Sequence, residues 1–243
     1  MTKWKFASSA VVVTIALLLW SLAEDSFQRD IPRDLSWDVP DYRLADTHWE
    51  IGEDGRIYIQ VEHFFLVDIS PEMVAWFYQQ LPISTVQLGG VTYPLYHIFH
   101  PTEHGIISVI EAAPDGAQGM ASGSIIQRYE WFGPFDSRGA ARIVALSPAG
   151  MSAIPVAGPF EIGEVRHSFN ALNGGTAYTV DVVVGSQLPI LGPLLNLYLR
   201  NWVFHPEMLE QWLRHQIEEV ASLQFFLPQI YAQRDSGTHF LLE

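Results

Sequence analysis

The sequence contains no cysteine. This absence excludes a disulfide scaffold, a cysteine nucleophile, an iron–sulfur centre and any thiolate-bound metal. Basic residues are also few, because 13 lysines and arginines stand against 27 acidic residues and the formal charge is −14. A chain this acidic is repelled by a phosphate backbone, so we do not expect nucleic acid as a partner.

The rest of the composition is that of a folded protein with a large core. Of the 243 residues, 49% are hydrophobic and 13% are aromatic, whereas only 16% are charged. A chain this apolar is not expected to be disordered, and its length suits one large domain. We therefore expect residues 24–243 to form a single domain, and an oligomer of it is compatible with the sequence.

The first 23 residues have the pattern of an export signal. Lys3 and Lys5 precede an apolar run over residues 6–22, and Ser21 and Ala23 are small residues that suit a cleavage site. Cleavage would release an exported domain, periplasmic or extracellular. Because the run approaches the roughly 17 residues of a short membrane span, an uncleaved anchor is the alternative. We expect contact with a membrane through this segment only.

Helix and strand patterns then alternate along the chain. Ser70, followed by Pro71 and Glu72, predicts the start of a helix. Short segments separated by glycine and proline clusters predict an antiparallel sheet of about five or six strands. These segments are residues 93–99, 106–111, 123–132, 140–145, 160–169 and 176–184. A long helical region follows and is predicted to end before Pro228.

The last predicted helix, residues 205–227, places two polar side chains on its apolar face. At 100° per residue, His215 and Glu219 lie inside or beside that face, whereas Glu210 and Arg214 form an exposed pair. Burial of an unpaired carboxylate is costly, so Glu219 needs a partner, a proton or a cation. A His and a Glu four residues apart can ligate one metal ion, and they can equally hydrogen-bond each other.

Three histidines lie close together near the end of segment 93–99, namely His97, His100 and His104. In a strand, His100 would share a face with Tyr96 and His97 would lie on the opposite face. Either one of them supplies a further metal ligand, or the group is a histidine cluster at the exposed end of a strand.

Four motifs, in this order, resemble the diacetylphloroglucinol hydrolase family. They are Ser-Pro-Glu-Met-Val-Ala-Trp at 70–76, Tyr96-x-x-Phe99-His100-Pro101-x-Glu103-His104, Gln-Arg-Tyr-Glu at 127–130, and Trp212-x-x-His215-x-x-x-Glu219 before Phe-Leu-Pro at 226–228. The likeness covers about residues 61–231. Members of this family are zinc-dependent enzymes that cleave a carbon–carbon bond between an aromatic ring and an acyl group.

The resemblance implies a fold and a site. The fold is α+β and START-like, or helix-grip: a curved antiparallel sheet packed on a long C-terminal helix around a cavity. The cofactor is zinc, which suits nitrogen and oxygen ligands and therefore a chain without cysteine. The implied ligands are His100, Glu130, His215 and Glu219. Substrate contacts would come from aromatic and histidine side chains: Tyr93 or Tyr96, His104, His167 and Tyr178.

Two positions depart from the implied pattern. Strict alternation places Glu130 on the face opposite the apolar Ile125, so the cavity wall is polar there, or a bulge intervenes, or Glu111 or Glu161 is the ligand instead. Glu103 stands where Asn or Asp is expected, which leaves the identity of the substrate open.

The resemblance implies hydrolysis of a phenolic or diketone-type small molecule. Zinc can polarise an acyl carbonyl and lower the pKa of bound water toward 7, while a histidine or tyrosine exchanges protons with the ring. The alternative is an exported START-like carrier of an apolar or lipid ligand, because fold alone does not determine function.

Overall fold

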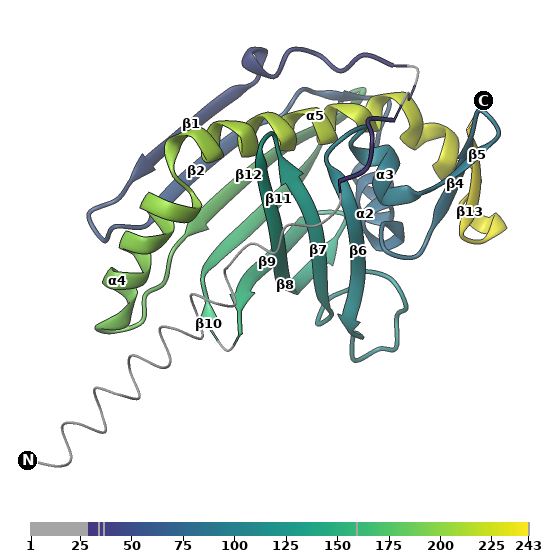
Figure 1. Ribbon diagram of the computed structural model, residues 1–243. Helices are drawn as coiled ribbons and strands as arrows, with labels where there is room; N and C mark the ends of the chain where they lie inside the picture. The colour runs from purple at the N-terminus through teal and green to yellow at the C-terminus, as the bar shows by residue number, and fades with distance from the viewer. Residues whose placement is uncertain (1–28, 34, 36, 159, 243) are drawn as a thin grey trace, which may run out of the picture.

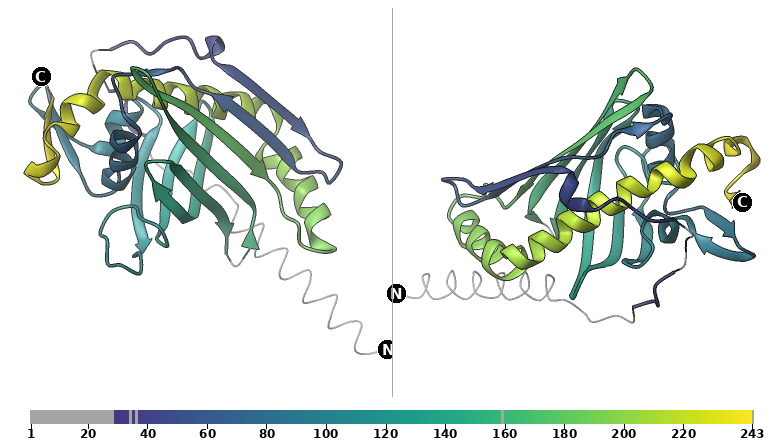
Figure 2. Two further views of the ribbon diagram at one scale, coloured as in Figure 1. Left: turned by 180° about the vertical axis from the view of Figure 1, so that it is seen from behind. Right: turned by 90° about the horizontal axis from the view of Figure 1, so that it is seen from above.

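A curved antiparallel sheet and a long C-terminal helix dominate the molecule (Figures 1 and 2). The computed structural model describes residues 29–242 apart from 34, 36 and 159, so the predicted export or anchor segment lies outside the described residues. The strand order is β1-β2-β12-β11-β9-β8-β7-β6, with β10 beside β9 and β3 beside β12. The predicted α+β helix-grip arrangement is therefore confirmed. Among the described residues, no helix is long and apolar enough to cross a membrane.

The main sheet has more strands than the five or six that were predicted. Its strands are β1 (Asp46–Ile51), β2 (Ile57–Glu62), β3 (Leu66–Val67), β6 (His104–Glu111), β7 (Ile125–Phe132), β8 (Phe135–Ser147), β9 (Gly150–Ala157), β10 (Phe160–Glu161), β11 (Gly163–Leu172) and β12 (Gly175–Val184). The strand that the pattern missed in mid-sheet is β9. Its many small residues and Pro155 conceal the alternation of buried Met151 and Ala153. A second sheet joins β4 (Thr85–Leu88), β5 (Val91–Pro94) and β13 (His239–Leu242).

The described chain has seven helical elements, of which α5 is the longest. They are η1 (Tyr42–Leu44), α2 (Pro71–Gln80), α3 (Leu95–Phe99), α4 (Leu191–Tyr198), η2 (Leu199–Val203), α5 (Pro206–Tyr231) and η3 (Arg234–Ser236). Helix α2 begins as predicted, because Ser70 caps it and its side chain accepts a hydrogen bond from the Met73 amide. Helix α5 continues through Pro228, so its predicted end was wrong; burial of Leu227 and Ile230 holds the last turn.

Segment 93–99 was predicted as a strand, but most of it is helical. Strand β5 ends at Pro94 and helix α3 follows at once. The buried residues of the helix are Leu95, Tyr96, Ile98 and Phe99. This spacing is helical rather than alternating, and the sequence interpretation overlooked it.

The core lies between α5 and the concave face of the sheet. Phe77 of α2 packs its ring against Phe99 of α3 at 4.9 Å and against Phe226 of α5 at 5.6 Å. These aromatic contacts fix α2 and α3 against the second half of α5. The same packing sets the chain after α3, which contains His100 and His104, beside the middle of α5 (Figure 1).

Candidate metal centre

Two histidines and one glutamate bring their ligand atoms together inside the molecule. Nε2 of His104 lies 3.2 Å from Nε2 of His215 and 3.2 Å from Oε2 of Glu219. Nε2 of His215 lies 3.5 Å from the same oxygen. All three side chains are buried.

The positions of these residues follow from the elements that carry them. His215 and Glu219 are one helical turn apart on the buried face of α5, as their spacing predicted. His104 begins β6, directly opposite Glu130 on β7. The centre therefore forms where α5 crosses the edge of the sheet.

The second ring nitrogen of each histidine fixes which nitrogen is free to bind. Nδ1 of His104 donates to the carbonyl oxygen of Tyr96 at 2.7 Å, and Nδ1 of His215 donates to the Glu103 carboxylate at 3.0 Å. A carbonyl and a carboxylate can only accept, so Nδ1 must carry the proton in each neutral ring. Nε2 of each neutral ring is therefore unprotonated. Two such lone pairs face each other, and a proton or a metal ion between them is needed to relieve their repulsion.

The electrostatics of the centre show how a proton can take that place. Burial alone would lower the pKa of His215, but its hydrogen bonds with Glu103 and Glu219 outweigh burial and raise the pKa to about 9. Burial would raise the pKa of Glu219, yet its contacts with His104 and His215 hold it well below its ordinary value. Burial lowers the pKa of His104. Glu219 is therefore an anion at neutral pH.

The donor set fits zinc in both chemistry and spacing. Zinc takes imidazole nitrogen and carboxylate oxygen at about 2.0–2.2 Å in tetrahedral geometry, which separates neighbouring ligand atoms by about 3.3 Å. The three separations of 3.2, 3.2 and 3.5 Å match that spacing. The carbonyl and the carboxylate on the Nδ1 atoms also match the hydrogen-bond partners that orient histidine ligands in metal sites.

His100, which the resemblance implied as a ligand, lies in a neighbouring group. That group contains His100, Glu103 and His215, and Nε2 of His100 is 3.1 Å from Oε2 of Glu218. Its ring stacks on that of His215 at 4.5 Å between centroids. Burial and the charge of His215 hold the pKa of His100 well below its ordinary value. The other group found among the described residues contains Glu219 together with His104 and His215. His100 is not part of that group.

Glu103 and Arg214 form an ion pair beside the centre. Arg214 donates to Glu103 and, at 2.6 Å, to Glu218, while the Gly133 amide donates to Glu103 at 2.8 Å. The prediction of an exposed Glu210–Arg214 pair was therefore wrong for Arg214, which is half-buried. Helical periodicity predicts the direction of the Arg214 side chain around α5. It cannot show that the segment after α3 covers that side of the helix.

Glu130 lies on the inner face of β7 with Ile126 and Arg128, so the sheet wall is polar here. Its carboxylate accepts a hydrogen bond from the Tyr96 hydroxyl at 2.5 Å and lies 3.3 Å from Arg128. It belongs to neither of the two groups of converging ligand atoms found among the described residues. The alternatives Glu111 and Glu161 are exposed, and Glu161 pairs with Arg142.

The proposed substrate residues divide into three places. His167 and Tyr178 lie together on the inner face, where Nδ1 of His167 is 2.7 Å from the Tyr178 hydroxyl. Tyr78 of α2 extends this chain, with its hydroxyl 2.5 Å from that of Tyr178. Tyr96 contacts Glu130, and its ring stacks on His104 at 3.8 Å. Tyr93 lies apart from both, in the three-stranded sheet.

Sequence reasoning missed His63 and Arg128. His63 follows β2, packs its ring 4.8 Å from that of Tyr178, and has no hydrogen-bond partner for either ring nitrogen within the described chain. Burial lowers its pKa to about 3. Nε of Arg128 is likewise buried without a partner. Continuing the inward alternation of Ile59 and Val61 by one step would have pointed to His63.

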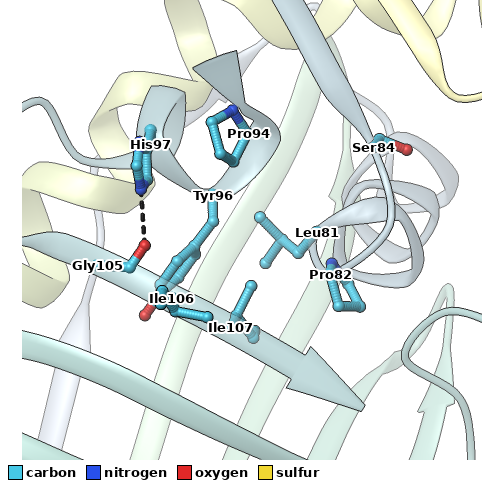
Figure 3. Close-up of a pocket in the computed structure, with 9 residues that line it drawn as sticks. All are labelled: Leu81, Pro82, Ser84, Pro94, Tyr96, His97, Gly105, Ile106 and Ile107. Carbon is cyan, nitrogen blue, oxygen red and sulfur yellow. Dashed lines mark hydrogen bonds between the residues drawn. The ribbon is translucent and has the colours of Figure 1, made fainter.

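A pocket of about 210 Å³ lies beside the edge strand β6. Figure 3 shows the residues that line it. Its wall is mostly apolar: Leu81, Pro82, Ser84, Pro94, Tyr96, His97, Gly105, Ile106 and Ile107. We predicted a cavity between the sheet and the long helix, whereas this pocket lies between the end of α2, β5, α3 and β6. Tyr96 connects this pocket to the candidate centre, because it lines the pocket and its ring stacks on that of His104 at 3.8 Å.

Comparison with known proteins gives structural likenesses only. No family model and no curated protein matches the chain. Ara h 8.0201 is 12% identical over 74% of this chain and 98% of its own, with a TM-score of 0.40. A START superfamily protein from Mycobacterium smegmatis is 16% identical over 72% of this chain and 97% of its own, with a TM-score of 0.41. Protein Ms6760 from the same organism is 14% identical over 72% of this chain and 96% of its own, with a TM-score of 0.42.

Proposed function

We propose that the chain binds one zinc ion through His104, His215 and Glu219 and uses it to hydrolyse a carbon–carbon bond next to an acyl group. The observation that carries this proposal is the convergence of two imidazole nitrogens and one carboxylate oxygen, all buried, at the spacing of zinc ligands. Three protein ligands are typical of catalytic zinc sites, which keep a position for water or substrate. Glu130 is left out of this ligand set, because its carboxylate accepts from Tyr96 and pairs with Arg128.

The substrate class is a phenolic or diketone-type small molecule, as the motif resemblance implies. Zinc, when bound, would polarise the acyl carbonyl and lower the pKa of water. Hydrolysis adds hydroxide to the acyl carbon and a proton to the departing carbon. The buried chain Tyr78, Tyr178 and His167 supports the second task, because its three polar atoms are joined by hydrogen bonds of 2.5 and 2.7 Å.

The charges on the inner face of the sheet favour a substrate with an electron-rich oxygen atom. Burial lowers the pKa of His167 to about 4, so its ring is neutral at pH 7 and its Nδ1 can accept a hydrogen bond from the Tyr178 hydroxyl. Arg128 lies on the same inner face with an unpartnered Nε. A phenolate or enolate oxygen would satisfy that nitrogen and gain a charge-assisted hydrogen bond.

A second candidate function is transport of an apolar ligand without reaction. The observation that favours it is His63, whose two ring nitrogens lack partners inside an aromatic core. A carrier would satisfy them with a polar atom of its ligand. The His and Glu group would then be structural, with a proton on His215 in place of a metal ion.

The two functions separate on metal content. In the zinc proposal, the purified full chain holds close to one zinc per chain, and chelation removes activity toward acylated phloroglucinols or β-diketones until zinc is restored. Glu219→Gln loses most of the zinc with little change in volume, whereas Glu210→Gln, on the exposed face of the same helix, retains it. A chain that takes up no zinc and yields a lipid on organic extraction would reject the hydrolase and leave the carrier.

A further inference from the structure

Helix α4 and the π-helical turn η2 carry exposed apolar side chains. Ile190, Leu194 and Leu197, at a spacing of four and three residues, are 86%, 57% and 46% exposed, and Trp202 is 76% exposed. Leu194 and Leu197, three residues apart in α4, share one helical face, and Ile190 directly precedes the helix. Large apolar side chains gathered in this way on a surface mark a contact with a partner or a membrane.

The charge of this surface distinguishes it from the rest of the chain. In a protein of formal charge −14, residues 182–206 contain no aspartate or glutamate, and Arg200 is the only charged side chain among them if His205 is neutral. A lipid surface therefore meets no acidic side chain from this segment. Tryptophan and leucine are also residues that bind well at the boundary between lipid headgroups and acyl chains.

The position at which the described chain begins supports a lipid occupant. Arg29 donates to Asp136 at 2.6 Å and to the carbonyl oxygens of Gly133 and Pro134 at 2.8 Å, in the turn between β7 and β8 and the start of β8. Phe135, at the start of β8, packs its ring 5.0 Å from that of His205, which lies two residues after η2. The first described residue therefore lies beside the β7–β8 turn, and Phe135 connects that turn to His205, just after η2.

The length of the preceding chain limits how far a membrane can be. Residues 6–22 form the apolar run, and six residues, 23–28, connect it to Arg29. Six residues span at most about 20 Å. If the run stays in a bilayer, the β7–β8 turn and the neighbouring η2 must lie close to that bilayer.

We propose that the surface formed by Ile190, Leu194, Leu197 and Trp202 docks on the lipid bilayer that holds residues 6–22. These four side chains carry no charge, so zwitterionic phosphatidylcholine is a sufficient partner. Docking fixes the orientation of the domain on the membrane. It goes beyond the proposed hydrolysis and does not depend on it.

The absence of cysteine allows a direct test on the full chain. Leu194→Cys and Leu172→Cys each introduce a single thiol for an environment-sensitive fluorophore. Leu172 is the matched control, because it is 58% exposed and lies at the β11–β12 turn, at the opposite end of β12 from α4. Both labelled chains are reconstituted in phosphatidylcholine vesicles, with and without a lipid that carries a nitroxide quencher on its acyl chain.

The expected result is a blue-shifted emission at position 194 that is quenched several times more strongly than emission at position 172. Equal, unshifted emission at both positions would overturn the proposal. A blue shift at position 194 that the nitroxide lipid does not quench would also overturn it, because protein, such as a second copy of this chain, would then cover the surface. Leu197→Cys repeats the measurement if Leu194→Cys does not fold.

Discussion

At the scale of single residues, the proposed zinc ion would compete with a proton for the place between His104 and His215. Both Nδ1 atoms are committed to acceptors, so the only free lone pairs of His104 and His215 point at each other across 3.2 Å. Because the pKa of His215 is raised to about 9, its Nε2 carries a proton at neutral pH when no metal ion is bound. Zinc must displace that proton, so the hydrogen bond from His215 to Glu103 should remain in both states.

We predict that His63→Leu stabilises the ligand-free chain by about 1 kcal/mol, because an apolar side chain of similar size replaces a buried imidazole without partners. The variant should also lose less stability in acid. With its pKa at about 3, His63 stays neutral in the folded chain while the unfolded chain takes up a proton below about pH 6.5, so stability falls as pH falls from 6.5 toward 3. Urea unfolding of parent and variant at pH 7.5 and pH 5 measures both effects. A destabilised variant with an unchanged pH slope would show that His63 has a partner.

Arg214→Ala should destabilise the chain by about 2 kcal/mol, because it leaves the buried Glu103 carboxylate with His215 as its remaining positive partner. Glu210→Ala, one turn earlier on the exposed face, is the control and should change stability by less than about 0.5 kcal/mol. Chemical denaturation compares the two. Equal effects would mean that the ion pair with Glu103 contributes nothing to stability.

At the scale of elements, signals that depend on near neighbours in the sequence predicted structure well. The start of α2 was predictable because Ser70, Pro71 and Glu72 each favour a helix terminus for a separate physical reason. The inward direction of His215 and Glu219 followed from helical geometry. Helix α3 was missed because five residues are too few for a sustained period, and its buried pattern emerges only against α2 and α5.

Ser70→Ala tests the cap of α2. It should lower the free energy of unfolding by about 1 kcal/mol through loss of the hydrogen bond to the Met73 amide, whereas Ser70→Asp should retain stability. Thermal unfolding of the three chains is sufficient. If Ser70→Asp loses as much as Ser70→Ala, the capping interaction is not what holds this terminus.

At the scale of the whole molecule, features that depend on pairing between distant segments could not be predicted from the sequence. The helix-grip arrangement was predictable from the order of short strands and a long amphipathic helix. Which histidine of the 97–104 segment lies beside both His215 and Glu219 was not, because that choice depends on the register of β6 against β7 and on the path of the chain after α3. The same pairing brings Arg214 over Glu103 and turns Glu130 inward.

The central claim is that His104, and not His100, shares a metal ion with His215 and Glu219. The most direct test is zinc per chain, measured by elemental analysis after dialysis against limiting zinc, in the parent, His104→Gln and His100→Gln. We predict close to one zinc in the parent, most of it retained in His100→Gln, and nearly all of it lost in His104→Gln while the chain remains folded by circular dichroism. Equal zinc in the two variants, or a parent that binds none, would contradict the metal centre described here.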